Sequence, residues 1–275
     1  MLCPGNKDHI LHFRINTDLI AFLIVLRITV RSHDDTCRIT VHELHFGISR
    51  ETARRDLRNL EADGVLKRTH GGAVAIHGGN EANEYPVAIR EIHRFREKNE
   101  ICRKAAAHIS DGEVIFADNS STTRYLAQHI PGDIGVTVLT NSLGMLIEAG
   151  RRGCEKHTYI CLGGIFKSRN LSMYGSITEN CIRDYYPDTV FLSCTGINTS
   201  NGILTDGSMD EVEAKKMMIQ NSKKVILLAD NSKLEKEGQV FLCDIRDVDL
   251  IIFDHAVSDE VVSRLDEFGC KTECV

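Results

Sequence analysis

The sequence predicts an α/β protein of two domains, an N-terminal winged helix-turn-helix and a larger C-terminal domain whose mostly parallel sheet is covered by helices. Three observations lead to this prediction. A basic amphipathic segment followed by a short basic strand lies within residues 48–72. A stretch rich in Gly, Ala and Asn comes next. Beyond residue 95, apolar strand-like runs alternate with helical segments, a pattern typical of a parallel sheet packed against helices.

The basic segment begins with a residue suited to capping a helix. Ser49 stands directly before the helical pattern and can accept a hydrogen bond from a free N–H of the first turn. Ala53, Leu57 and Leu60 recur at spacings of four and three, which defines one apolar stripe. The other side carries Glu51, Arg54, Arg55 and Arg58. We therefore expect a helix with one face for the core and one for a partner.

A basic strand follows this helix. Gly64 supplies the backbone freedom that a helix C-terminus needs, and residues 65–72 form a short basic strand closed by a Gly-Gly turn. A helix followed by a basic hairpin is typical of a winged helix.

Such a helix, with its first turn in the major groove, brings side chains to base edges, where Arg can bridge two acceptors of guanine. The predicted DNA-binding residues are Ser49, Glu51, Thr52, Arg54 and Arg55 at the start of the helix, and Arg58, Lys67, Arg68 and His70, which we expect on phosphates. The alternative is a solvated amphipathic helix, which most charge runs form. The pattern alone leaves both interpretations open.

Charge and composition limit the function classes. The net charge of −6 argues against a protein that binds nucleic acid over its whole surface, so any contact with DNA must be local to the basic segment. Ten cysteines stand singly with no CxxC pair, which favours reduced thiols, and we expect Cys161 and Cys194 to pack in strands. Twelve histidines show no HExxH spacing. We expect no metal and no cofactor.

The apolar run at residues 19–30 is the one membrane candidate in the sequence. It is about half as long as a spanning helix and is interrupted by Arg27. Asp8 and Asp18 disfavour a signal peptide. We expect a cytoplasmic protein that makes no membrane contact.

Residues 71–85 lack sustained periodicity, which predicts a connector between two domains. The expected domains are residues 1–75, a linker at 76–95, and residues 96–275. In the second domain we predict helices at 97–109, 122–129 and 142–149, and strands at 113–118, 136–140, 158–164, 188–194, 223–230 and 249–254.

Small polar residues follow several of these strands, where open α/β sheets bind ligands. Residues 118–123, DNSSTT, can surround an anion with hydroxyls and backbone N–H groups at the start of a helix. Residues 140–142, TNS, repeat this arrangement after the next strand, and Gly163 and Gly164 can let backbone approach the same ligand. Each segment alone is explained by an ordinary N-cap. Two on neighbouring strands favour a phosphate or sugar site.

Both halves resemble the DeoR family of bacterial sugar-metabolism regulators. The N-terminal resemblance rests on ARRDL at 53–57 followed by Leu60, Gly64, Leu66, Arg68, His70, Gly71 and Gly72. The preceding helix, with Val41, Glu43, Leu44, Phe46 and Gly47, is about two residues shorter than in the family. The C-terminal resemblance runs from about residue 99 to 254 and includes DNSSTT, TNS, LGG, GIN, NGI and ADNSK.

The resemblance implies a sensor domain similar in fold to ribose-5-phosphate isomerase that binds phosphorylated sugars and thereby alters DNA binding. It implies that residues 120–123 hold phosphate. The expected effector-binding residues are Asp118, Ser120, Ser121, Thr122, Thr123, Thr140, Asn141, Ser142, Gly163, Gly164, Glu213, Lys216 and Lys233. Two residues depart from the family pattern, Ser120 in place of a common Gly and Asn198 in place of a common Asp.

The leading hypothesis is therefore a DNA-binding repressor of a carbohydrate operon, controlled by a sugar phosphate and acting as a homo-oligomer. Two winged helices on a symmetric operator gain affinity through effective concentration. The alternative is a sugar-phosphate isomerase-like enzyme, with Glu213 and Lys216 as acid and base. Residues 194–198 lack the acids that enediol chemistry needs, so we expect no catalytic residues. A purely structural interaction protein leaves the polar strand ends unexplained.

Overall fold

The computed structural model describes residues 38–39, 55, 58, 66–69, 72–75, 90, 94–255 and 257–275. The chain divides into two compact units, residues 1–80 and 81–275. In the described part of the chain, no helix combines the length and the apolar character that a membrane crossing requires. The apolar run at 19–30 lies outside the described residues.

The first unit contains a small antiparallel sheet in the order β1-β3-β2. Its strands are β1 (Arg38–Ile39), β2 (Leu66–Thr69) and β3 (Gly72–Ala75). Lys67 pairs with Val74 and Thr69 with Gly72, which confirms the predicted basic hairpin. The third strand, β1, was not predicted.

Parallel pairing builds the main sheet of the second unit, in the order β15-β14-β12-β9-β4-β5-β6. Its strands are β4 (Val114–Ala117), β5 (Val136–Thr140), β6 (His157–Cys161), β9 (Thr189–Leu192), β12 (Lys224–Ala229), β14 (Leu250–Phe253) and β15 (Lys271–Cys274). The helices are α5 (Phe95–Ala106), α6 (Leu126–His129), α7 (Leu143–Arg152), α8 (Ser176–Arg183), α9 (Met209–Gln220) and α10 (Asp259–Glu267), with short 3-10 turns η1 (Thr123–Tyr125), η2 (Asn231–Lys233) and η3 (Ile245–Asp247).

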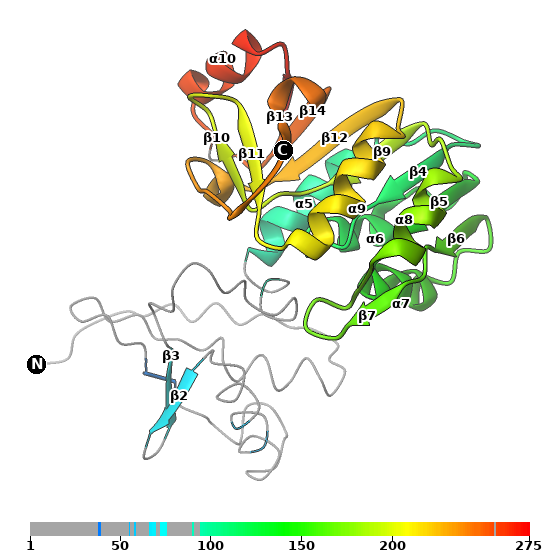
Figure 1. The fold of residues 1–275 in the computed structure, drawn as a ribbon, viewed down its shortest axis with the longest axis horizontal. Coiled ribbons are helices and arrows are strands. Elements are labelled where there is room, and N and C mark those ends of the chain that lie inside the picture. The colour runs from blue at the N-terminus through cyan, green and yellow to red at the C-terminus, as the bar shows by residue number, and fades with distance from the viewer. Residues whose placement is uncertain are drawn as a thin grey trace, which may run out of the picture. The chain divides into compact units, whose positions relative to one another are not determined.

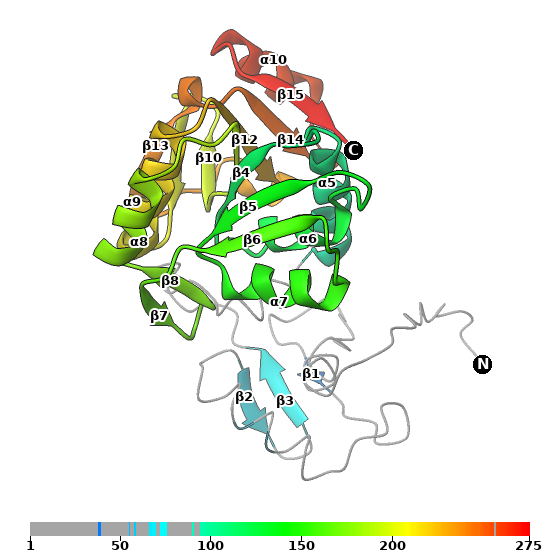
Figure 2. The same cartoon turned by 90° about the vertical axis from the view of Figure 1, so that its right-hand side faces the viewer.

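Helices cover both faces of this sheet (Figures 1 and 2). Helices α5, α6 and α7 pack on one face, and α8 and α9 on the other. Each face of the sheet has its own hydrophobic core. Ile115 packs in the core on the side of α5, α6 and α7, and Phe116 packs in the core on the side of α8 and α9, because successive strand residues point to opposite faces. Central strands such as β9 are buried along their whole length, which explains their unbroken apolar runs.

Two smaller elements complete the second unit. A hairpin joins β7 (Ile165–Lys167) to β8 (Ser172–Tyr174). An antiparallel sheet contains β10 (Gly196–Asn198), β11 (Ile203–Asp206) and β13 (Val240–Asp244), in that order. Neither was predicted, because both are made of short segments that alternate neither at helical nor at strand spacing for long enough to be recognised.

The strand order reverses direction between β4 and β9. From β4 the chain proceeds through β5 to β6 at one edge, and then crosses to β9, from which it proceeds through β12 and β14 to β15. Adjacent strands whose connections leave in opposite directions create a crevice at their carboxyl ends, where open α/β sheets bind ligands. The segment after β4 is DNSSTT, one of the two predicted ligand segments.

Three details of the prediction were wrong. Residues 122–129 form the turn η1 and then the short helix α6, not one continuous helix, because Thr123 bonds back into the preceding loop. The helix predicted at 97–109 ends at Ala106. Cys161 is exposed because it lies on the edge strand β6, whereas Cys194 is buried as expected.

Candidate ligand site at the strand ends

Asp118 lies at the point where the strand order reverses, and its buried carboxylate joins the two sides. Its Oδ2 accepts a hydrogen bond from the backbone N–H of Ser193, after β9, at 3.1 Å. Its Oδ1 accepts from the backbone N–H of Ser120 at 3.0 Å and from Thr123 Oγ1 at 2.6 Å. One carboxylate thus fixes the loop after β4 against the end of β9.

The loop at residues 118–123 is buried along its whole length. Ser120 Oγ accepts from the backbone N–H of Thr123 at 3.1 Å, so the serine that departs from the family pattern caps its own turn. Within the described residues, the backbone N–H groups of Asn119, Ser121 and Thr122 donate to no protein acceptor. Buried N–H groups without partners are costly, and several in one turn form a site for an anion.

A buried cation lies beside this loop. Lys98 on α5 is 4% exposed, and its Nζ donates to Ser121 Oγ at 2.9 Å. Because α6 has a single turn, the positive charge at this loop comes from the Lys98 ammonium rather than from a helix dipole.

The second predicted loop, residues 140–142, is also buried, but its hydroxyls are largely used within the protein. Ser142 caps α7 by accepting from the backbone N–H of Met145 at 3.2 Å, and Thr140 Oγ1 accepts from the backbone N–H of Ser142 at 3.0 Å. Asn141 differs: its Nδ2 donates to Met173 O at 2.9 Å, and its buried Oδ1 has no partner among the described residues.

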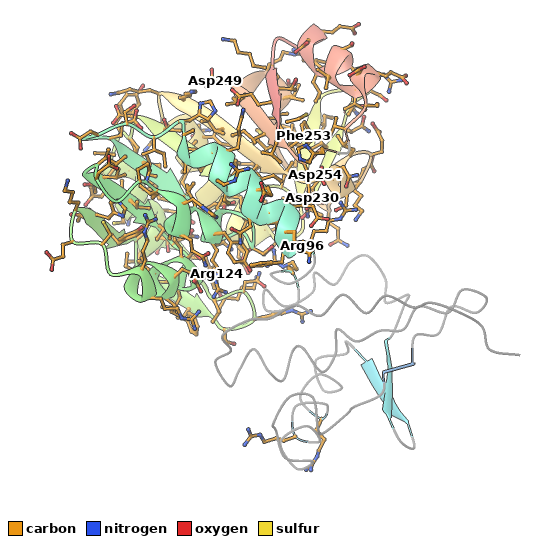
Figure 3. All side chains as sticks on the ribbon, turned by 180° about the vertical axis from the view of Figure 1, so that it is seen from behind. Arg96, Arg124, Asp230, Asp249, Phe253 and Asp254 are labelled. Atoms are coloured by element: carbon orange, nitrogen blue, oxygen red, sulfur yellow. The ribbon has the colours of Figure 1, made fainter. Side chains whose placement is uncertain are left out.

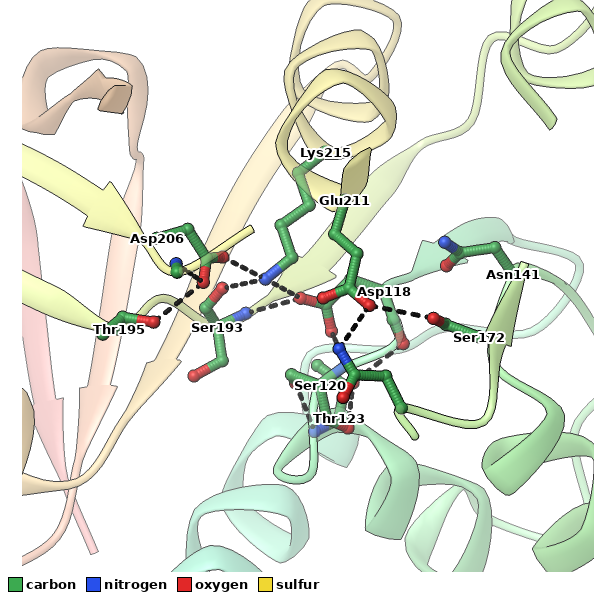
Figure 4. Close-up of polar contacts among 12 residues, drawn as sticks. Asp118, Ser120, Thr123, Asn141, Ser172, Ser193, Thr195, Asp206, Glu211 and Lys215 are labelled. Carbon is green, nitrogen blue, oxygen red and sulfur yellow. Dashed lines mark hydrogen bonds and ion pairs between the residues drawn. The ribbon is translucent and has the colours of Figure 1, made fainter. Parts of the chain in front are cut away.

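An ion-paired lysine occupies the other side of Asp118. Lys215 on α9 lies between Asp118 and Asp206, at 3.1 Å and 2.6 Å from their carboxylate oxygens (Figure 4). Burial alone would lower the pKa of Lys215, but the two carboxylates outweigh it and raise that pKa. Lys215 in turn keeps the pKa of Asp206 below its usual range despite burial. Lys215 is thus a permanent cation that binds α9 to the strand ends.

The turn of the β7–β8 hairpin reaches the same cluster from the other direction. Glu211 Oε1 accepts from Asn170 Nδ2 at 2.7 Å and from Ser172 Oγ at 2.9 Å. All three side chains are buried, and Asn170 Oδ1 has no partner in the part of the chain that the structure describes. Figure 4 shows Glu211, Ser172 and Asn141 on the side of Asp118 away from Asp206.

A third group lies at the ends of β12 and β14. Asp230 and Asp254 are close together there (Figure 3), and Asp254 Oδ1 accepts from the backbone N–H of Asn231 at 2.8 Å. Lys233 follows in η2. Burial raises the pKa of the Cys194 thiol to about 12, and the positive charge of Lys233 acts in the opposite direction. The predicted residue Lys233 therefore lies just beyond the end of β12.

Other predicted effector residues either lie away from this cluster or are explained by packing alone. Glu213 and Lys216 pair with each other at 3.2 Å on the exposed side of α9, and Lys216 also lies over the Phe241 ring. Gly164 has φ +119°, and a Cβ there would lie 2.6 Å from Tyr174 O. Packing against the hairpin therefore explains this glycine without a ligand.

Asn198, the other departure from the family pattern, closes a turn, because its Oδ1 accepts from the backbone N–H groups of Ser200 and Asn201.

Sequence reasoning missed Lys98, Asn170, Asp206, Glu211 and Lys215. In the sequence these residues are ordinary members of charged helices or turns. Glu211 and Lys215 are four residues apart and so share a helix face, which is the one available signal, but it does not distinguish a buried face from a solvated one.

Among the predicted DNA-binding residues, Arg55 and Arg58 are helical and exposed. Lys67 and Arg68 lie in β2. The others, Ser49, Glu51, Thr52, Arg54 and His70, lie outside the described residues.

Both halves of the chain match known families. Residues 32–78 match the DeoR-like helix-turn-helix domain, and residues 93–255 match the DeoR C terminal sensor domain. The chain belongs to the DeoR family. Its family and its relatives' names identify a transcriptional regulator, and the isomerase alternative is not favoured.

DeoR-type relatives align with most of the chain. The HTH-type transcriptional regulator YulB of Bacillus subtilis (strain 168) is 35% identical, over 86% of this chain and 90% of its own length. The L-fucose operon activator of Escherichia coli (strain K12) is 34% identical, over 78% and 84%. The HTH-type transcriptional repressor GlcR of Bacillus subtilis (strain 168) is 32% identical, over 81% and 83%. Activators and repressors thus both occur among DeoR-type relatives.

Among solved structures, ribose 5-phosphate isomerase A from Methanocaldococcus jannaschii aligns with a TM-score of 0.37 and 17% identity, over 50% of this chain and 53% of that one. This likeness is too distant to bear on function.

Proposed function

We propose that this regulator represses a carbohydrate operon and that a phosphorylated sugar, bound at the strand ends of the second unit, controls its binding to DNA. The observation that carries the proposal is the buried loop 118–123. It presents three backbone N–H groups without protein acceptors beside the buried ammonium of Lys98. Phosphate oxygens are strong acceptors that would satisfy all of these donors.

Buried amide oxygens without hydrogen-bond partners support a sugar as the other part of the proposed ligand. The amide oxygens of Asn119, Asn141 and Asn170 are buried and lack partners within the described residues. Buried acceptors of this kind need a donor, and sugar hydroxyls are donors. A phosphorylated polyhydroxyl compound therefore matches both the free donors of the loop and the free acceptors around it.

The proposed effector site thus comprises residues 118–123, Thr140, Asn141, Ser142 and Lys233, to which we add Lys98 and Asn170. Gly163 and Gly164 shape the nearby backbone. Glu213 and Lys216 take part only if the ligand reaches the exposed side of α9.

For the DNA side, we propose the predicted set of Ser49, Glu51, Thr52, Arg54, Arg55, Arg58, Lys67, Arg68 and His70. Arg55 and Arg58 are three residues apart in a helix and exposed, which is compatible with one cationic face toward DNA. The basic strand β2 pairs with β3 in a hairpin of the kind that forms the wing of winged helices. We also propose that the protein is cytoplasmic and that it binds a symmetric operator as a homo-oligomer.

Calorimetric titration of the full-length protein tests the ligand class. The titrants are a panel of triose, pentose and hexose phosphates, the same sugars without phosphate, and inorganic phosphate. We expect one sugar phosphate to bind at least about tenfold more tightly than either of its parts, because each part leaves half of the site's polar groups unpaired.

Thr123→Val removes the hydroxyl that holds Asp118 Oδ1, so it should weaken this binding by about tenfold or more. Thr158→Val, at an exposed position of β6, is the matched control and should leave the affinity unchanged. Equal affinity for the sugar with and without phosphate, or equal affinity in both variants, would contradict the proposed site.

A further inference from the structure

The start of α5, together with Arg90 before it, is linked by hydrogen bonds to the proposed phosphate loop. Lys98 Nζ donates to Ser121 Oγ at 2.9 Å and also to the backbone carbonyl of Arg90. Arg90 lies ten residues after Asn80, where the first unit ends. One buried ammonium therefore joins the loop to the stretch of chain that leads back to the DNA-binding unit.

The same segment is anchored a second time by Arg94. Its guanidinium lies 3.6 Å from Asp230 Oδ1 and 3.4 Å from Asp254 Oδ2, and it also donates to Asn231 Oδ1. Arg94 adopts a left-handed backbone conformation, with φ 57°, immediately before α5. Figure 3 labels Asp230 and Asp254 at the end of the sheet where α5 begins. Arg94 and Lys98 thus contact residues at three strand ends, those of β4, β12 and β14.

A phosphate in loop 118–123 would change what Lys98 binds. An ammonium and a phosphate oxygen carry opposite charges, so the hydrogen bond between them gains an attraction that a bond from the same ammonium to a neutral carbonyl lacks. The attraction is strengthened further where water is excluded, as it is around Lys98. A neutral carbonyl such as that of Arg90 cannot compete equally with a doubly charged phosphate beside Ser121.

We propose that Lys98 couples the effector site to the linker: in the free protein its ammonium donates to the Arg90 carbonyl, and phosphate draws the ammonium away and breaks that bond. This inference rests on the proposed function. It supplies the differential contact that a ligand needs in order to shift an equilibrium between two states, because the Lys98–Arg90 bond belongs to the free state alone. Lys98 is then a positioning residue for the linker as well as a ligand of the phosphate.

The test compares the full-length protein with Lys98→Met, which keeps the length of the side chain and removes its charge. Lys104→Met is the matched control, because Lys104 lies on the same helix and pairs at its other end with Glu273 at 3.2 Å. Affinity for the operator duplex is measured by fluorescence anisotropy, without effector and at saturation with the sugar phosphate that calorimetry identifies. Saturation separates loss of coupling from loss of effector affinity.

We expect saturating effector to change the operator Kd of the wild type and of Lys104→Met by about tenfold or more, and that of Lys98→Met by less than about twofold. Hydrogen exchange gives a second readout: effector should speed amide exchange in peptides covering residues 88–98 of the wild type but not of Lys98→Met. A full response of Lys98→Met at saturation, or unchanged exchange in the wild type, would overturn the proposal.

Two further variants keep the test decisive if Lys98→Met does not fold. Lys98→Arg retains the charge and should keep effector binding while reducing the tenfold response, because a guanidinium cannot reproduce both ammonium bonds. Arg103→Gln, which breaks an exposed pair with Glu100 on the same helix, lies outside the proposed site and should leave the response intact. Equal responses in the wild type and Lys98→Arg would count against the relay. A wild type that binds no sugar phosphate would instead refute the proposed function itself.

Discussion

Single buried charges organise the strand-end site, and Lys215 is the residue on which most of it depends. Its ammonium donates to Ser193 O at 2.9 Å and pairs with both Asp118 and Asp206. Thr195 Oγ1 also donates to Asp206, at 2.8 Å. Because Asp118 in turn shapes the proposed phosphate loop, the position of that loop depends on a lysine of a different helix.

Lys215→Met should therefore be strongly destabilising. It leaves two buried carboxylates without their cation, a change that typically costs about 3–5 kcal/mol of unfolding free energy. Urea denaturation followed by circular dichroism measures the loss. Arg264→Gln, which breaks an exposed pair with Glu260, is the control and should not shift the midpoint measurably. Equal midpoints for the two variants would show that Lys215 is not the centre of the cluster.

In DNA binding, we expect substitutions of Arg55 and Lys67 to have different effects, because we propose that Arg55 contacts base edges and Lys67 a phosphate. Arg55→Ala should cost about 1–3 kcal/mol of operator binding and relax base choice, because it removes a contact to base edges. Lys67→Ala should weaken binding to all sequences and reduce the salt slope by about one, as expected for a phosphate contact. Anisotropy with operator and random duplexes at several salt concentrations separates them. Identical losses on both duplexes for both variants would contradict this division.

At the scale of elements, the sequence was a good guide wherever a strand is buried on both faces. Runs such as VTVLT and KKVILLAD stand between turn residues, and the structure places β5 and β12 there. It was a poor guide to the hairpin β7–β8 and to the antiparallel sheet, whose short strands are stabilised by distant contacts. The same holds for Lys98 and Lys215, since helix periodicity cannot distinguish a lysine that meets a buried carboxylate or hydroxyl from one in water.

The hairpin β7–β8 offers a test at this scale. Gly164→Ala should destabilise the protein, because its Cβ would lie 2.1 Å from Thr178 Oγ1 and 2.6 Å from Tyr174 O at φ +119°. Gly150→Ala, in α7 with no atom of the described residues within 4 Å of the new Cβ, should stabilise it by about 1 kcal/mol. Thermal unfolding of both variants provides the comparison. A midpoint for Gly164→Ala at or above that of the wild type would mean that the hairpin can move away from the strand end.

At the scale of the whole molecule, we propose that the two units have separable tasks, which residues 90–98 connect along the chain. The sensor unit fixes its ligand loop through Asp118 and Lys215, and through Lys98 the same loop holds the start of α5. Family membership could be predicted from the sequence because the motifs of both halves are local. The proposed coupling could not be, since it depends on hydrogen bonds between residues 8 and 23 positions apart.

The measurement that tests this account most directly is the affinity of the full-length protein for a fluorescent duplex from its own upstream region. Random duplex serves as the reference, at two salt concentrations, with and without the panel of sugar phosphates. We predict salt-sensitive binding that prefers the upstream duplex and that one sugar phosphate weakens. No preference over random duplex, or a preference that every sugar phosphate leaves unchanged, would contradict it.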